Sequence, residues 1–394
     1  MLINKIKAIA ETIYQEVKTN RRHLHAHPEL SFEEYKTAAF VKMELSKLGI
    51  PFEEMANTGV LGIIKGEKTS DKVIALRADM DALPILEAND VPYKSTNPGV
   101  MHACGHDVHT SSLLGTANIL NSLKAEFGGT IKLIFQPGEE RLPGGANLMI
   151  QEGVLENPKP QSVMGQHVMP FIEAGKIGIK SGKYMASTDE LYVTIKGKGG
   201  HGAQPQQNID PVVIMAQMIT ALQTIISRNS DPRSPSVLSF GKVIANGATN
   251  VIPNEVYLEG TFRTLNEKWR ADAHLKMKKL AESIAEGMGG SCDFRIEKGY
   301  PFLINEEKLT ARVKEYAIDY LGQENVLDLD IWMAAEDFAY FSQAADACFY
   351  RLGTGNESLG INSSVHTPTF DIDESALNTS TGLMAYLTLK ELGN

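Results

Sequence analysis

The chain has 394 residues, with 38 basic and 48 acidic side chains, so its formal net charge is 38 − 48 = −10. This acidic balance argues against nucleic acid and against an anionic membrane as partners, because both require a basic surface. A hydrophobic fraction of 43% and a charged fraction of 22% are typical of a globular protein with a buried core, and the length predicts two or three domains. We find no uninterrupted apolar run of about 18 residues, the length that predicts a membrane span.

The N-terminal segment and the cysteines bear on localisation. Lys5, Lys7 and Glu11 interrupt the apolar positions of the first fifteen residues, which is unlike a signal peptide. Three scattered cysteines give no pattern typical of a disulfide framework, and they fit a reducing compartment, most simply the cytoplasm. They are Cys104, Cys292 and Cys348.

The first part of the chain alternates helices with strands. Apolar residues from Ile3 to Val17 recur at spacings of three and four, which predicts a helix. Ser31 and Glu34 form an S-x-x-E capping box that predicts the start of a second helix. Three apolar runs predict buried strands and one stretch between the first two predicts a helix: 73–76, 131–135 and 163–165, and 108–123. This alternation predicts an α/β domain with a mainly parallel sheet, whose chemistry lies at the carboxyl ends of the strands.

The middle of the chain has a different order of elements. The patterns predict a strand, a helix beginning at Asp210-Pro211, two strands, a helix and a last strand, over 191–195, 210–228, 237–243, 255–264, 267–288 and 292–296. The order β-α-β-β-α-β is that of a ferredoxin-like domain. We therefore expect residues 184–297 to form a second domain inserted into the first, which comprises 1–183 and 298–394. The first domain then resumes with a helix, a short strand and a final helix, near 306–321, 349–352 and 374–391.

Cysteine and histidine lie two residues apart in the segment MHACGHD. Cys104 and His106 can point the same way on an extended loop, with Gly105 allowing the backbone to bend between them. A thiolate with an imidazole is a ligand pair for zinc or a neighbouring first-row ion. A buried thiol beside helix-capping residues is the alternative interpretation.

Two adjacent carboxylates, Glu139 and Glu140, follow the strand predicted at 131–135. One could bind a metal ion while the other acts as general base for a water molecule, although a solvated acidic turn would look the same. His167 and His366, each alone, are more often structural. Together with Cys104, His106 and Glu140 they make five ligand-type groups, too many for one tetrahedral site and suited to a pair of ions.

Three further candidates lie in the predicted insertion, and one cluster lies near the N-terminus. His201 stands in the glycine-rich segment KGKGGHGAQP, Asn250 in NGATNVIPNEV, and Arg263 in GTFRT, where arginine would suit a substrate carboxylate. Each is equally compatible with an ordinary loop or surface position. His23, His25 and His27 cluster in HLHAHPEL, which could bind a metal ion or simply turn one helix into the next.

Taken together, these motifs resemble the aminoacylase and carboxypeptidase family of two-metal amidohydrolases. The branch it resembles contains hippurate hydrolase, N-acyl-amino-acid deacetylases and indoleacetyl–amino acid hydrolases. The resemblance covers almost the whole chain, through RRHLHAHPELSFEE, ALRADMDALPI, MHACGHDVHT, FQPGEE, GQHVMP, KGKGGHGAQP, ATNVIPNEV, GTFRT, AAEDFAYF and VHTPTFDIDE. It implies that the inserted domain serves as a lid and in dimer contacts, so that the protein is a homodimer.

Carried over residue by residue, the resemblance implies a role for each site position. It implies Glu139 as general acid/base and His201 as a group that stabilises the oxyanion, from the partner subunit. It implies that Asn250 and Arg263 contact substrate and that Asp79 orients a ligand. It implies five ligands of two divalent ions, Zn, Mn, Co or Ni: Cys104, His106, Glu140, His167 and His366. The three histidines of HLHAHPEL match no ligand.

The chain departs from the family pattern at three places. Gly138 replaces the usual alanine of the Gln-Pro-Ala-Glu-Glu motif, Arg141–Gly145 replaces a small glycine-rich stretch, and Ala334-Ala335 replaces Gly-Ser. None removes a ligand, so the substrate pocket is affected more than the reaction. We expect hydrolysis of the amide bond of small N-acyl amino acids; a dipeptidase or aminopeptidase with the same site, and a metal-stabilised binding protein without turnover, are the alternatives.

Overall fold

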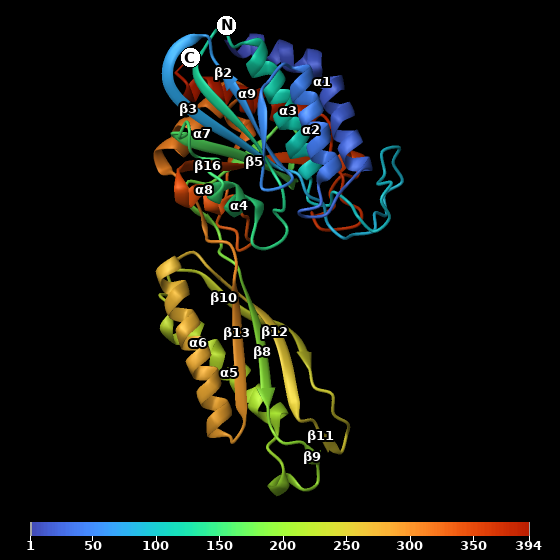
Figure 1. Ribbon diagram of the computed structural model, residues 1–394, viewed down its shortest axis with the longest axis vertical. Coiled ribbons are helices and arrows are strands. Elements are labelled where there is room, and N and C mark those ends of the chain that lie inside the picture. The colour runs from blue at the N-terminus through green and yellow to red at the C-terminus, as the bar shows by residue number, and fades with distance from the viewer. Residues whose placement is uncertain (1, 394) are drawn as a thin grey trace. The chain divides into compact units, whose positions relative to one another are not determined.

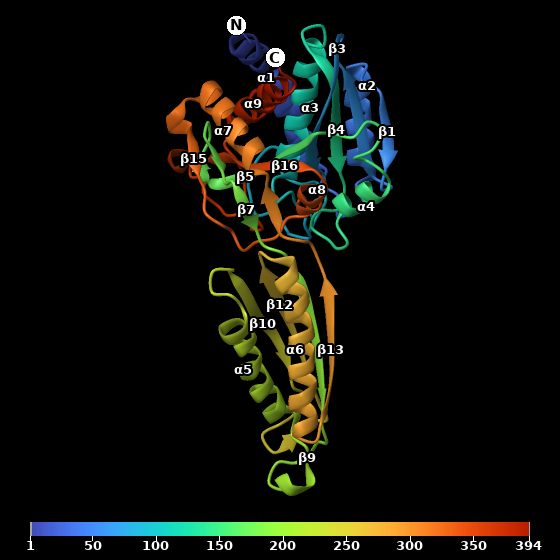
Figure 2. The same cartoon turned by 90° about the vertical axis from the view of Figure 1, so that its left-hand side faces the viewer.

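The computed structural model describes residues 2–393, which divide into two compact units (Figures 1 and 2). Within the described residues, the first comprises 2–184, 304–331 and 337–393, and the second comprises 185–303 and 332–336. The short return of 332–336 to the second unit has no counterpart in the sequence patterns.

The first unit is built on an eight-stranded mixed sheet with the order β1-β2-β4-β3-β5-β16-β6-β15. Strand β3 is parallel to β4 and β5, and β5 is parallel to β16, so the middle of the sheet is parallel as predicted. The strands are β1 (Phe52–Met55), β2 (Gly59–Lys65), β3 (Lys68–Asp79), β4 (Gly128–Gln136), β5 (Ser162–Glu173), β6 (Ile177–Ile179), β15 (Val326–Asp328) and β16 (Asp346–Gly355). Strands β7 (Gly182–Met185) and β14 (Leu303–Asn305) form a separate pair.

Helix α3 is the central helix of this unit and packs against α1 and α9, which also contact each other (Figure 1). It is buried on nearly all sides, including many of its polar side chains, which is why it shows little amphipathic pattern. The other helices flank it or pack beside the strands. The helices of the unit are α1 (Leu2–Ala26), α2 (Tyr35–Lys47), α3 (His106–Ser122), α4 (Gly145–Gln151), α7 (Glu307–Leu321), α8 (Ala339–Ala344) and α9 (Ala376–Glu391).

The prediction that Ser31 and Glu34 form a capping box at the start of a helix is wrong. Helix α2 begins at Tyr35, with Glu34 as a cap residue whose side chain makes no capping hydrogen bond. Both side chains are buried in tertiary contacts instead: the Ser31 hydroxyl donates to Asp81 Oδ2 over 2.6 Å, and Glu34 Oε1 accepts from the Gly138 amide over 2.8 Å. The local signal was overridden because both polar groups hold the loop before α2 against the strand ends.

The second unit has the predicted β-α-β-β-α-β order. Its antiparallel sheet runs β10-β12-β8-β13, and α5 and α6 pack against it through an apolar core (Figure 2). The elements are β8 (Asp189–Lys196), β9 (Gly200–His201), α5 (Pro211–Asn229), β10 (Ser236–Ile244), β11 (Val251–Ile252), β12 (Glu255–Thr264), α6 (Glu267–Gly287) and β13 (Ser291–Lys298).

Helix α5 is long and apolar enough, by length and composition, to cross a membrane. Its sequence does not form an uninterrupted apolar run, because Gln217, Thr220 and Gln223 lie among the apolar residues. Asp210 caps the helix as predicted, accepting from the Val212 amide over 2.8 Å. One face of α5 packs on the sheet core of the second unit, as a core helix of a globular domain does.

Candidate metal centre

The ligand-type side chains lie together at the ends of several strands and at the start of one helix. Strand β3 ends at Asp79, β4 ends just before the loop of Glu139 and Glu140, and β5 carries His167. Helix α3 begins at His106, after Gly105, whose φ of +79° and contact with Val168 exclude a side chain there. The predicted position at the carboxyl ends of parallel strands therefore matches the geometry.

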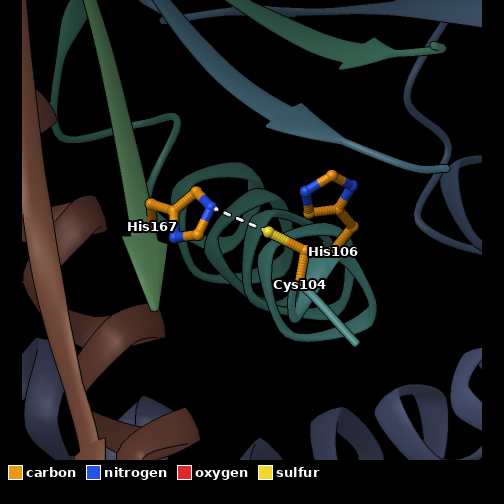
Figure 3. A group of neighbouring side chains, drawn as sticks. All are labelled: Cys104, His106 and His167. Atoms are coloured by element: carbon orange, nitrogen blue, oxygen red, sulfur yellow. Dashed lines mark hydrogen bonds between the residues drawn. The ribbon is translucent and has the colours of Figure 1, made fainter. Parts of the chain in front are cut away.

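The five expected ligands lie together. Cys104 Sγ is 3.4 Å from His167 Nε2 (Figure 3) and 3.3 Å from His366 Nε2. Glu140 Oε1 lies 3.1 Å from His366 Nε2 and 4.0 Å from His106 Nε2. His366 comes from the loop after β16, and its amide donates to the Ala103 carbonyl over 2.8 Å, which fastens that loop to the cysteine segment.

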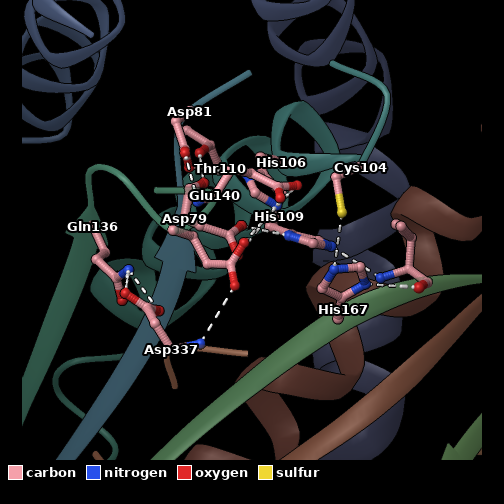
Figure 4. A network of polar contacts seen from close by, with 12 residues as sticks. Asp79, Asp81, Cys104, His106, His109, Thr110, Gln136, Glu140, His167 and Asp337 are labelled. Atoms are coloured by element: carbon pink, nitrogen blue, oxygen red, sulfur yellow. Dashed lines mark hydrogen bonds and ion pairs between the residues drawn. The ribbon is translucent and has the colours of Figure 1, made fainter. Parts of the chain in front are cut away.

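Buried hydrogen bonds fix the imidazoles of His106 and His167 (Figure 4). The Nδ1 atom of His106 lies 3.1 Å from Asp81 Oδ1, and that of His167 lies 2.8 Å from the Val168 carbonyl. In each ring the Nε2 atom is thus left to face the cluster. Such outer hydrogen bonds fix the ring orientation and the tautomer of metal-binding histidines.

Asp79 and His109 form a buried pair beside these two histidines. Asp79 Oδ1 is 2.5 Å from His109 Nδ1, and His109 Nε2 accepts from the Val168 amide over 2.9 Å. Asp79 Oδ2 also lies 3.6 Å from His106 Nε2, in keeping with the orienting role expected for it. His109 clusters with His106 in MHACGHDVHT and Asp81 follows Asp79 in RADMD, but neither residue was assigned a role from the sequence; their spacing of three and two residues from His106 and Asp79 was the available signal.

Glu139 has two differently placed oxygens. Its Oε1 accepts from the Asp337 amide over 3.3 Å, and its Oε2 lies 4.0 Å from His106 Nε2. The Asp337 carboxylate in turn accepts from Arg77, Gln136 and the Ala146 amide over 2.7 to 3.0 Å. Asp337 therefore anchors the loop that carries Glu139. In the sequence it stood only within the AAEDFAYF motif, without an assigned role.

The cluster carries an excess of negative charge. Burial raises the pKa of the Cys104 thiol well above its usual value, and the charges of Glu140 and Glu139 raise it further. Burial opposes protonation of His106, but Asp79 and Asp81 outweigh it and raise its pKa to about 10. Burial together with the Arg351 charge lowers the pKa of His167, so this ring is neutral.

These residues fit a divalent cation. His106 Nε2 and Glu140 Oε1 are buried and make no hydrogen bond, although other donor atoms surround them. Cys104, His106 and His167 can converge on one ion, and Cys104, Glu140 and His366 on another. A cation there would offset the carboxylate charges and favour the thiolate form of Cys104.

The remaining candidates, His201, Asn250 and Arg263, lie in the second unit. His201 is exposed on β9 and pairs with Val251 of β11, and the Gly202 amide donates to the Asn250 carbonyl over 2.8 Å. His201 and Asn250 are therefore neighbours. Arg263 is half-buried on β12, where its Nε donates to Thr261 Oγ1 over 3.1 Å, and burial lowers its pKa.

A parallel-sheet domain with thiol, imidazole and carboxylate groups at its strand ends is the arrangement expected of a metal-dependent hydrolase. The sequence profile described as peptidase family M20/M25/M40 matches residues 75–390, and the chain belongs to this family. It is 45% identical over 309 residues to the N-acyl-L-amino acid amidohydrolase of Geobacillus stearothermophilus, covering 78% of this chain and 83% of that protein.

Two further relatives match over most of their length. The N-acetyl-L-cysteine deacetylase of Bacillus subtilis is 40% identical over 358 residues, covering 91% of this chain and 83% of that protein. The crystal structure of the YxeP protein of Bacillus subtilis, described as a dinuclear metal-binding peptidase of the M20 family, superposes with a TM-score of 0.83 at 35% identity, covering 97% and 99% of the two chains. The family expected from the sequence motifs is confirmed.

Proposed function

We propose that this protein hydrolyses the amide bond of N-acyl amino acids with two divalent metal ions. The observation that carries the proposal is the placement of a buried carboxylate, Glu139, beside five converging ligand-type groups. Relatives named as amidohydrolase and deacetylase of N-acyl amino acids support the substrate class. The products are a carboxylic acid and a free amino acid.

The ions would be held by the five residues Cys104, His106, Glu140, His167 and His366. When bound, such ions supply a Lewis acid for the scissile carbonyl and lower the pKa of water. Glu139 Oε2, which faces the cluster, takes the proton of the attacking water and returns it to the leaving nitrogen. The hydrogen bond from the Asp337 amide to Oε1 fixes the direction in which the carboxylate points.

We propose that the second unit recognises the substrate and forms the dimer interface. Arg263 would bind the free carboxylate of the amino acid and Asn250 its amide region, while His201 stabilises the oxyanion in the partner's site. The exposed position of His201 supports a role outside its own unit.

A homodimer through the second unit is supported by an apolar surface on two neighbouring elements. Among the described residues, β10 pairs only with β12, so its other edge is open. Exposed apolar side chains lie on β10 and α5: Val213, Val237, Val243 and Ile244. A second copy covering α5 and the β10 edge would bury this surface and also explain why α5 is so apolar. The expected cytoplasmic location fits a thiol ligand that must stay reduced.

Glu139→Gln tests the catalytic assignment. Glutamine keeps the shape and can accept from the Asp337 amide, but it cannot take a proton. We expect unchanged metal content, measured by mass spectrometry, and kcat lowered by at least about 10²-fold on N-acetyl and N-benzoyl amino acids. Glu140→Gln is the matched control, because the same change one residue later should lower metal content. Near wild-type turnover of Glu139→Gln would refute the assignment.

A substrate and metal screen separates this function from the alternative reaction. Metal-stripped protein is reconstituted with Zn, Mn, Co or Ni and offered N-acyl amino acids and dipeptides. Hydrolysis of dipeptides alone would refute the proposed substrate class. Mixing His201→Ala with Glu139→Gln subunits should restore about a quarter of wild-type activity if His201 acts across the dimer; absence of recovery after confirmed exchange would refute that role.

A further inference from the structure

The histidine-rich segment near the N-terminus contains a buried imidazole that the proposed reaction leaves without a role. His25 lies at the end of α1 and is 0% exposed. Its Nδ1 is 2.8 Å from Asp107 Oδ2 and its Nε2 is 3.2 Å from Glu87 Oε1. Asp107 directly follows His106 in the first turn of α3, so His25 contacts the ligand-bearing segment one residue from a ligand.

Arg21, one turn earlier on α1, extends these contacts to the second ligand-bearing segment. It is 0% exposed, and its Nε donates to Asp107 Oδ2 over 2.8 Å. Its guanidinium also donates to Asp371 Oδ1 over 3.1 Å. Asp371 lies five residues after His366, in the same loop. One buried arginine thus ties the start of α3 to the loop of His366.

Glu87 connects the same cluster to the irregular segment between β3 and α3, which leads into Cys104. Its carboxylate is buried and accepts from the Ser95 amide over 2.7 Å. Asn89, two residues on, donates to the Phe370 carbonyl over 2.8 Å, again in the His366 loop. The three segments that supply Cys104, His106 and His366 are therefore joined through the end of α1.

We infer that Arg21 and His25 are positioning residues that hold the Cys104–His106 segment and the His366 loop in the arrangement that binds metal. The inference rests on the proposed two-metal function. Neither side chain contacts a proposed ligand, so each acts through Asp107, Asp371 or Glu87. Since these carboxylates are held at fixed places by buried partners, loss of His25 releases the start of α3 and the segment before it together. The primary effect is on metal affinity.

Three substitutions of His25 separate its two contacts. His25→Asn keeps a donor near the Nδ1 position, facing Asp107, whereas His25→Gln keeps one near Nε2, facing Glu87; His25→Ala removes both. The matched control is His274→Ala, because His274 also binds a buried aspartate, Asp189, over 2.7 Å but lies in the second unit. The full-length proteins are stripped of metal and titrated with Zn²⁺ against a competing chelator, and the unfolding temperature of each stripped protein is measured.

We expect His25→Ala to bind Zn²⁺ at least about tenfold more weakly than the wild type, as other residues that orient ligands do. His25→Asn should recover more affinity than His25→Gln, and His274→Ala should bind as the wild type does. Unchanged Zn²⁺ affinity in His25→Ala, or an equal loss in His274→Ala, would overturn the inference. If His25→Ala does not fold, wild-type affinity in both His25→Asn and His25→Gln would overturn it. Failure of the wild type to bind two ions would instead overturn the proposed function.

Discussion

The loop that carries the proposed general base contains Gly138 where the family pattern that the motifs resemble has alanine, and the structure predicts that an alanine here would be harmful. Gly138 has a φ of +56°. A Cβ atom on it would lie 2.2 Å from Phe32 Cε1 and 2.4 Å from Phe32 Cζ, far inside van der Waals contact. The change to test is therefore Gly138→Ala, a substitution that the family pattern alone would call neutral.

The expected effect of Gly138→Ala has two parts, a backbone cost and a steric clash. A residue with a Cβ atom pays about 1–2 kcal/mol in the left-handed region. The clash must then be relieved by moving Phe32 or the loop, and both are anchored, because Glu34 Oε1 accepts from the Phe32 amide over 2.9 Å and from the Gly138 amide over 2.8 Å. A loop shift of about 1 Å at Glu139 would lower the rate by up to about 10²-fold. We expect kcat to fall by about 10- to 100-fold with little change in KM.

The assay is steady-state hydrolysis of an N-acyl amino acid with metal content measured in parallel. Phe32→Ala combined with Gly138→Ala removes the clashing ring and should recover part of kcat. Gly175→Ala is the matched control, because Gly175 has a φ of +92° with no atom within 4 Å of the added Cβ, so it reports backbone strain alone. A kcat within about twofold of wild type for Gly138→Ala, or no recovery in the double variant, would refute the reasoning.

Three further predictions follow from described contacts. Asp337→Asn places an amide donor among the groups that donate to Asp337, so kcat should fall about 10- to 100-fold with metals retained, and unchanged kcat would contradict the anchoring role. Chelation should lower the unfolding temperature and re-added metal restore it, because ligand binding stabilises the folded state by about 2.7 kcal/mol at one hundred times Kd. Burial opposes ionisation of Asp189, but hydrogen bonds from His274 and Arg270 lower its pKa. Its stabilising contribution is thus complete above about pH 4 and is lost as the pH falls through the lowered folded-state pKa. Acid unfolding of Asp189→Asn should lack this dependence; a profile parallel to wild type would contradict it.

The fold could be predicted where periodicity reflects burial. The alternating strands and capped helices of the second unit follow their sequence patterns closely. In the first unit, the apolar run at 73–76 identified only the buried end of β3, which extends over Lys68–Asp79, because its exposed first half has no apolar alternation. The predicted capping box at Ser31 and Glu34 was wrong for a different reason. The sequence motif is present, but both side chains make tertiary hydrogen bonds in place of the capping contacts.

The candidate site was predictable where its residues stand in short motifs. Cys104 and His106 are two residues apart, and Glu139 and Glu140 are adjacent, so their chemistry can be seen in one stretch of sequence. Asp337 could not be found in this way, because its partner Arg77 lies 260 residues away along the chain. The buried role of His25 was likewise hidden, since its contacts with Asp107 and Glu87 join segments that carry no shared pattern.

The parallel pairing of β5 with β16 means that the large sheet can form fully only late in synthesis of the chain. Ser162 lies opposite Asp346 in this ladder, and the chain between the two strands contains the whole second unit. Domains generally fold as units as they emerge from the ribosome. The second unit can therefore be complete while the large sheet still lacks a central strand. His366, a proposed ligand, follows β16, so a nascent chain would complete its proposed metal centre only after its last segment has been made.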